Sequence, residues 1–157
     1  VVSGQGWFVA RYHRVHCTYV APGVSGGDCG ALIEQLALDI DARRPNQRVG
    51  VLYYTPESAA MDSPRRRQLA RVLEEREAVL KRTTAAYALA THSAFIRGVL
   101  STLFWMAPPG YPHKVVATPR EGLDFIAGKL PRFDPEDICR SFEAEIVRRG
   151  GQRREAS

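Results

Sequence analysis

The sequence has few of the residues that build disulfide frameworks, metal sites or membrane spans. Its three cysteines, Cys17, Cys29 and Cys139, are an odd number at wide spacings, which argues against a disulfide framework and favours a reduced compartment. No apolar run reaches the roughly 18 residues that a membrane-spanning helix needs. The first residues also lack the basic and apolar regions of a secretory signal, so we expect a cytoplasmic protein.

Excess charge of one sign is nearly absent from the body of the chain. The formal net charge is +5, but four of the 22 basic residues are arginines close to the C-terminus, at positions 148, 149, 153 and 154. The arginines at 65–67 share their predicted helix with Glu74, Glu75 and Glu77, which indicates a solvated helix face rather than a surface for phosphates. We expect no nucleic-acid partner.

A catalytic signature is missing as well. The motif Gly-Asp-Cys-Gly around Cys29 resembles the nucleophile motif of chymotrypsin-like cysteine proteases, but in those enzymes it lies late in the chain, after two β-barrels. His13, His16 and Cys17 carry metal-ligating atoms, yet in a strand His13 and His16 point to opposite faces. We therefore expect no enzymatic activity, no metal ion and no other cofactor.

The spacing of apolar residues predicts one α/β domain, since 157 residues suit a single hydrophobic core. β-branched and aromatic residues predict strands at 7–20, with a break near His13 or Arg14, and a nearly continuous apolar run predicts a strand at 48–55. Further strands are expected at 85–90 and 114–117. Helical spacing of apolar residues predicts helices at 32–40, 63–82 and 93–106, then from 119 and from 134 onward.

This order of elements favours a mixed β-sheet of four to five strands, with helices packed mainly on one face and an extra C-terminal helix. We expect the domain to span 5–131, the C-terminal helical extension 132–149 and a disordered basic tail 150–157.

Capping residues mark two of the predicted helix starts. Asp62 or Ser63 precedes Pro64, as is typical of an N-cap followed by proline in the first turn. Thr118, Pro119 and Glu121 form a capping box, in which the threonine and glutamate side chains are expected to bond to each other's backbone N–H groups.

The stretch from Ala85 to Ile126 resembles a known family. It reads as strand, helix, proline-rich turn, strand and capped helix, and its markers are Ser93, Arg97, Gly98, Trp105, Pro108 and Pro109. This pattern resembles the STAS-like, SpoIIAA-like domains, which are relatives of the anti-sigma-factor antagonists. The resemblance covers most of the chain and implies a non-enzymatic bacterial regulatory domain that binds a signalling partner.

Anti-sigma-factor antagonists are phosphorylated by a partner kinase on a serine that follows an aspartate at a helix start. Met61, Asp62 and Ser63 match the beginning of that motif, which makes Ser63 the candidate phosphosite. Pro64 and the arginines at 65–67 then replace the small, glycine-containing turn of the family. This departure argues against phosphoswitching and favours a capping role for Asp62 or Ser63.

Two functions follow as alternatives. The first is a regulatory interaction module that binds a kinase or another signalling protein through Asp62, Ser63, Arg65 and Arg66. The second is a small-molecule or lipid-binding domain that uses the apolar helix 95–105, as the loose kinship of this branch with lipid-carrier domains implies. The direction of Phe104 and Trp105 distinguishes the two, because exposure favours a partner or a homodimer, whereas a lined cavity favours a ligand.

Overall fold

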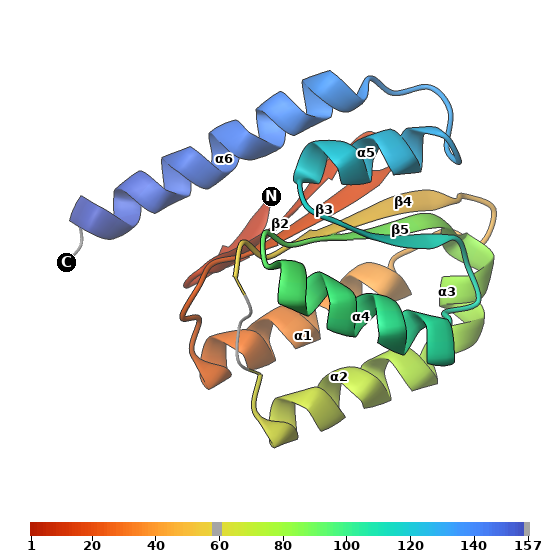
Figure 1. Ribbon diagram of the computed structural model, residues 1–157, viewed down its shortest axis with the longest axis horizontal. Helices are drawn as coiled ribbons and strands as arrows, with labels where there is room; N and C mark the ends of the chain where they lie inside the picture. The colour runs from red at the N-terminus through yellow and green to blue at the C-terminus, as the bar shows by residue number, and fades with distance from the viewer. Residues whose placement is uncertain (58–60, 156–157) are drawn as a thin grey trace.

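Six strands form one sheet whose spatial order follows the order of the chain (Figure 1). The structure, a computed structural model, describes residues 1–57 and 61–155, with side chains as far as residue 150. The strands are β1 (Val2–Gly4), β2 (Trp7–Tyr12), β3 (Val15–Val20), β4 (Val49–Tyr54), β5 (Thr84–Ala90) and β6 (His113–Val116). The helices are α1 (Gly26–Asp41), α2 (Ser63–Glu75), α3 (Glu77–Thr83), α4 (Ala94–Met106), α5 (Pro119–Ala127) and α6 (Pro135–Glu155).

The connections between strands decide which face each helix covers. β1, β2 and β3 are antiparallel neighbours, whereas β3, β4, β5 and β6 are parallel neighbours. The parallel pairs are joined by α1, then by α2 and α3, then by α4. Because such crossovers share one hand and each new strand is added at the same edge, these helices lie on one face, while α5 and α6 lie on the other (Figure 1).

The face under α5 and α6 holds the main core. Phe8 and Leu52 of the sheet are buried there together with Phe142 of α6. β5 contributes the alanines at 86, 88 and 90 to this core, and α5 contributes Gly122, where an added Cβ would lie 2.7 Å from Leu52 Cδ1. Small residues on both elements therefore let α5 approach the sheet closely.

The opposite face is packed more loosely. A smaller cluster of Trp7, Val9, Val20 and Leu32 is buried between α1 and the adjacent strands. α2 and α4 bury none of their own residues. This is the side of the sheet on which the helices enclose a cavity.

The predicted strands are all present, including the break at His13, which has a φ of 54° in the turn between β2 and β3. The sheet has six strands, one more than the four to five predicted. The additional strand is β1, which pairs with β2 and lies before the domain start predicted at residue 5. Val2–Gly4 is too short to show a period in the sequence, so only its pairing defines it as a strand.

The single helix predicted at 63–82 is two helices. The chain bends at Arg76, whose Nε and Nη2 each donate to one carboxylate oxygen of Asp41 at 2.9 Å. After the bend, Leu80 of α3 is buried. At the other end of the chain, α6 continues to Glu155, past the predicted helix end at 149 and into the segment predicted to be disordered; residues 156–157 lie outside the described part.

The two capping predictions are resolved by the hydrogen bonds. Asp62 is the N-cap of α2, since its Oδ1 accepts from the Arg65 N–H at 2.9 Å. Thr118 Oγ1 accepts from the Glu121 N–H at 3.2 Å, but the Glu121 carboxylate accepts from the Ala117 N–H at 3.1 Å rather than from that of Thr118.

No helix in the described ranges has both the length and the hydropathy to cross a bilayer.

Candidate functional site

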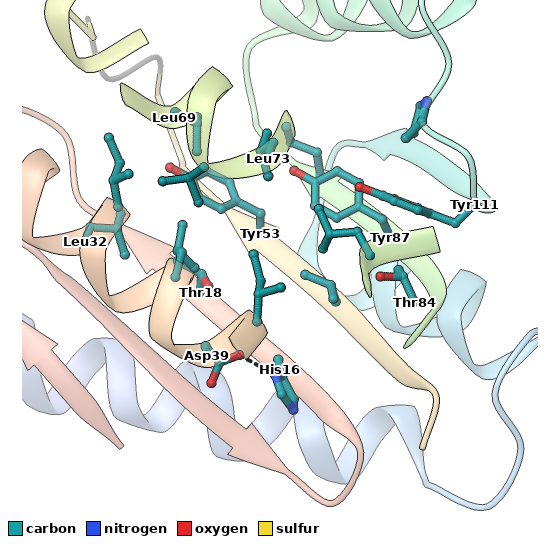
Figure 2. A pocket seen from close by; sticks show the side chains of 18 of the residues that line it. His16, Thr18, Leu32, Asp39, Tyr53, Leu69, Leu73, Thr84, Tyr87 and Tyr111 are labelled. Carbon is teal, nitrogen blue, oxygen red and sulfur yellow. Dashed lines mark hydrogen bonds and ion pairs between the residues drawn. The ribbon is translucent and has the colours of Figure 1, made fainter. Parts of the chain in front are cut away.

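A cavity of about 380 Å³ lies between the sheet and the helices α1, α2 and α4. Its floor is formed by side chains that alternate to this face of the sheet, among them Thr18, Tyr53 and Tyr87 (Figure 2). Most of its walls are apolar and come from Leu32, Leu36, Leu69, Leu73, Leu80 and Phe104. A concave, mostly apolar space with a few polar groups is the usual form of a small-molecule site.

Aromatic side chains keep α4 away from the sheet. Phe104 of α4 lies with its ring centroid 6.2 Å from that of Tyr87 and 5.2 Å from that of His113. The rings stand between helix and sheet, and α4 approaches the sheet mainly at β6, whereas α5 packs on alanines of the other face and approaches β4, β5 and β6. The size difference between the two faces of β5 is therefore what leaves this side hollow.

A buried carboxylate lies at one end of the cavity. Asp39 Oδ2 is 2.6 Å from His16 Nδ1, and Asp39 Oδ1 accepts from Arg11 Nε at 2.9 Å and also from Arg11 Nη2. Burial opposes ionisation of Asp39, but the hydrogen bonds and charges of His16 and Arg11 outweigh it and hold the pKa of the carboxyl below its usual range. Both oxygens of Asp39 are therefore engaged within the protein.

Arg43 lines the same cavity just after the end of α1. Its Nη1 donates to Thr84 Oγ1 at 3.1 Å and lies 3.5 Å from Thr83 Oγ1. The Nε of Arg43 is buried without an acceptor, and no carboxylate of the described residues forms an ion pair with the guanidinium. Burial lowers the pKa of Arg43, although a guanidinium stays protonated in proteins.

Three tyrosine hydroxyls complete the polar lining. Burial raises the pKa of Tyr53, Tyr87 and Tyr111 above the usual value, so the three phenols are neutral near pH 7 and each retains a proton to donate. Their hydroxyl groups form no hydrogen bond with another described residue. All three rings stand on the cavity side of the sheet (Figure 2).

The two predicted residues of α4 point in different directions. Phe104 lines the cavity, whereas the side chain of Trp105 is 83% exposed. The outer face of α4 carries a further exposed apolar stripe of Phe95, Val99, Leu103 and Met106. By the criterion of the sequence analysis, a side chain that lines a cavity favours a ligand and an exposed one favours a protein partner. Phe104 therefore meets the first condition and Trp105 the second.

The predicted docking residues at the start of α2 lie apart from Phe104 and Trp105, at the opposite end of the helical layer (Figure 1). Ser63 is exposed, and its Oγ accepts from Arg66 Nη2 at 2.8 Å. Arg65 Nη1 donates a hydrogen bond to Gln68 Oε1 at 2.8 Å, and the guanidinium of Arg65 packs against Gly30 of α1. The structure does not bring the two sets of predicted residues together.

The remaining chemical candidates occupy separate places. Cys29 is buried at the start of α1, and burial together with the charges of Asp28 and Asp62 raises the pKa of its thiol. Cys17 is buried in the core under α5 and α6, on the face opposite to that of His16. No group of three or more metal-ligating side chains comes together within the described residues.

The polar residues of the cavity were not predicted, although the sequence carries a signal for two of them. Leu32, Leu36, Asp39 and Arg43 are spaced four, three and four residues apart, which places them on one face of a helix. Asp39 and Arg43 therefore continue the apolar stripe of α1 toward its end. Charged residues on a stripe that faces the core indicate a polar site.

Comparison with known proteins identifies the fold but not a function. No protein-family model and no curated protein matches the chain. A crystal structure of an uncharacterized DUF3478-family protein with a SpoIIAA-like fold, from Shewanella loihica PV-4, is similar to the structure with a TM-score of 0.58 at 11% sequence identity. The similarity covers 80% of this chain and 98% of that one. The chain therefore has a SpoIIAA-like fold, as its sequence pattern predicts.

Proposed function

We propose that this SpoIIAA-like domain binds a small, largely apolar molecule in the cavity between the sheet and α1, α2 and α4, without converting it chemically. The observation that carries the proposal is the cavity itself, whose volume of about 380 Å³ falls in the range of about 300–1,000 Å³ that is typical of ligand sites. Well-packed interiors contain few voids larger than a water molecule. A space of this size between leucines and tyrosines is therefore better explained by an occupant than by poor packing.

A binding role without catalysis agrees with the reactive groups near the cavity. Neither serine nor cysteine is among the described residues that line it. Cys29 is outside the lining, and burial raises the pKa of its thiol, whereas a catalytic cysteine needs a lowered thiol pKa. His16 bonds to Asp39 through Nδ1, and the lining offers no serine or cysteine that its other ring nitrogen could activate.

Binding of the neutral fluorescent probe N-phenyl-1-naphthylamine tests the proposal. We expect saturable binding by the unmodified protein and about tenfold weaker binding by Leu36→Trp, because the larger side chain occupies the cavity. Leu38→Trp is the matched control, since Leu38 lies on the same helix but is 63% exposed. Leu73→Trp is a second blocking variant at a half-exposed position, in case Leu36→Trp does not fold. Absence of saturable binding, or equal binding by folded blocking variants, contradicts the proposal.

The exposed face of α4 favours a second candidate function, association with a protein. Phe95, Val99, Leu103 and Met106 form an exposed stripe beside Trp105, and apolar stripes of this kind mark interaction sites. A signalling protein that also contacts Asp62, Ser63, Arg65 and Arg66, or a second copy of the chain, is the partner proposed here.

Light scattering at high protein concentration tests self-association through α4. A dimer that Leu103→Asp dissociates, and that Ser101→Asp leaves intact, supports an interface on this stripe, since Ser101 is exposed elsewhere on the same helix. A monomeric mass for the unmodified protein contradicts the homodimer.

A further inference from the structure

We propose that the ligand of the cavity is an anionic amphiphile: an apolar body with one acidic oxygen group, such as a carboxylate, that is bound by Arg43. This inference rests on the proposed function and adds the chemical class of the ligand. It follows from the hydrogen bonds, the charges and the apolar walls around Arg43.

The guanidinium of Arg43 has donors that the protein does not use. A guanidinium carries five N–H groups, and the hydrogen bonds of Arg43 to other described side chains all come from Nη1. Its Nε is enclosed and has no acceptor. The last turn of α1 does not require the guanidinium either, because the Ala42 and Arg43 N–H groups bond to the carbonyls of Leu38 and Ile40. The enclosed Nε is out of reach of a bound group, but Nη2 is not enclosed and forms no hydrogen bond with a described residue, so its donors remain for such a group.

The charge of Arg43 is also not balanced within the site. Asp39 is the acidic residue of the cavity lining, and its two oxygens are already bonded to Arg11 and His16. One carboxylate thus stands among two guanidinium groups, which leaves a net positive charge at this end of the cavity. Arg43 is partly buried, and the Asp39 charge that acts on it is shared with Arg11, so an anionic group of a ligand is the natural complement.

The surroundings of Arg43 suit an acidic group attached to an apolar body. Tyr111 is near Arg43, and its ring centroid lies 6.4 Å from that of Tyr87. The hydroxyls of Tyr111 and Tyr87 are neutral donors, which favours an acceptor in this region. The remaining walls are formed by leucines of α1 and α2 and by Phe104, which offer contacts only to hydrocarbon.

Calorimetric titration with dodecanoate and with the neutral 1-dodecanol tests the inference, because the two probes share one chain and differ in the head group. We expect the unmodified protein to bind dodecanoate about tenfold more tightly than dodecanol. Arg43→Gln should lose this preference while retaining its affinity for dodecanol. Arg44→Gln, at the exposed neighbouring arginine, is the matched control and should behave like the unmodified protein.

The outcomes separate the two proposals. Equal affinity of the unmodified protein for the acid and the alcohol overturns the anionic class and leaves apolar binding intact. An unchanged preference in Arg43→Gln overturns the role of Arg43. If neither probe binds and N-phenyl-1-naphthylamine also fails to bind, the proposed function itself is refuted. Should Arg43→Gln not fold, the preference of the unmodified protein must disappear when the pH falls below the pKa of the carboxylic acid.

Discussion

Removal of the charge of Asp39 tests whether the buried cluster beside the cavity stabilises the fold. In Asp39→Asn the side chain keeps its size but loses its charge, and its three hydrogen bonds, two with Arg11 and one with His16, lose the carboxylate as their charged partner. Bonds to a charged partner contribute about 1.5–3 kcal/mol and bonds between neutral groups about 0.5–1.5 kcal/mol. Because Arg11 keeps its own charge, its bonds weaken only in part, and the interactions of residue 39 together weaken by about 1–2 kcal/mol.

The contribution of Arg11 must be reduced because its side chain is 53% exposed and water replaces part of the lost interaction. We expect a decrease of about 1.5 kcal/mol in the free energy of unfolding near pH 7, or a fall in Tm of about 3–6 °C. Asp41→Asn is the control, since Asp41 lies on the same helix and binds Arg76 at the surface. Its effect should be clearly smaller.

The effect of Asp39→Asn should also depend on pH. The pKa of Asp39 is lowered in the folded protein, so its charge stabilises the fold fully above the unfolded-state pKa of about 3.9. That stabilisation is lost as the pH falls through the lower folded-state pKa. Urea unfolding between neutral and acidic pH measures the difference between the two proteins. A difference that stays constant down to the lowest pH, or no difference at pH 7, refutes the reasoning.

Four further predictions concern packing, capping, the thiol and α4. Gly122→Ala should destabilise the protein by about 1–3 kcal/mol, because its Cβ meets Leu52, whereas Gly98→Ala, with open space around its Cβ, should stabilise it by about 0.5–1 kcal/mol; thermal unfolding of both variants decides. Asp62→Ala should cost about 1 kcal/mol through loss of the N-cap of α2, and Ser63→Ala clearly less, so a larger loss for Ser63→Ala contradicts the assignment. Iodoacetamide should label Cys29 more slowly than a free thiol, because burial raises the pKa of Cys29; mass spectrometry of the labelled peptide reports the rate, and fast labelling speaks against a buried thiol. Phe104→Ala should weaken binding of N-phenyl-1-naphthylamine and Trp105→Ala should not, since Phe104 lines the cavity and Trp105 is exposed; the reverse order would place the probe outside the cavity.

The two faces of β5 explain why this side of the molecule carries the site. Ala86, Ala88 and Ala90 point to α5, while Tyr87 points to α4 and the cavity. Alternation along the strand assigns small and large residues to opposite faces. The same seven residues thus hold one helix close to the sheet and another away from it.

Much of the fold was predictable because its signals are local. The strand region at 7–20 is marked by β-branched and aromatic residues, and the strand at 48–55 by a nearly continuous apolar run between turn residues. The start of α5 is marked by Thr118 and Pro119, and the order of the elements led to the SpoIIAA-like fold that the structure has. Each of these features depends on residues a few positions apart, so a single sequence contains them.

The break of the helix at Arg76 was not predictable in the same way. At the break Arg76 bonds to Asp41, which is 35 residues away in the sequence, so this contact cannot be read from the local pattern. The short strand β1 likewise exists only through its pairing with β2. β1 is thus defined by a tertiary contact, and the break at Arg76 coincides with one.

Apart from β1 and the break at Arg76, the sequence by itself determined the order of the elements, the alternation of residues along each strand and the apolar stripe of each helix, because all of these follow from fixed periods along the chain. Only the tertiary structure decided that Arg43, Tyr87 and Phe104 line one cavity and that Trp105 remains outside it. The physical reason is that periodicity defines direction, whereas the distance between a helix and a sheet is set by the sizes of all the side chains that meet between them.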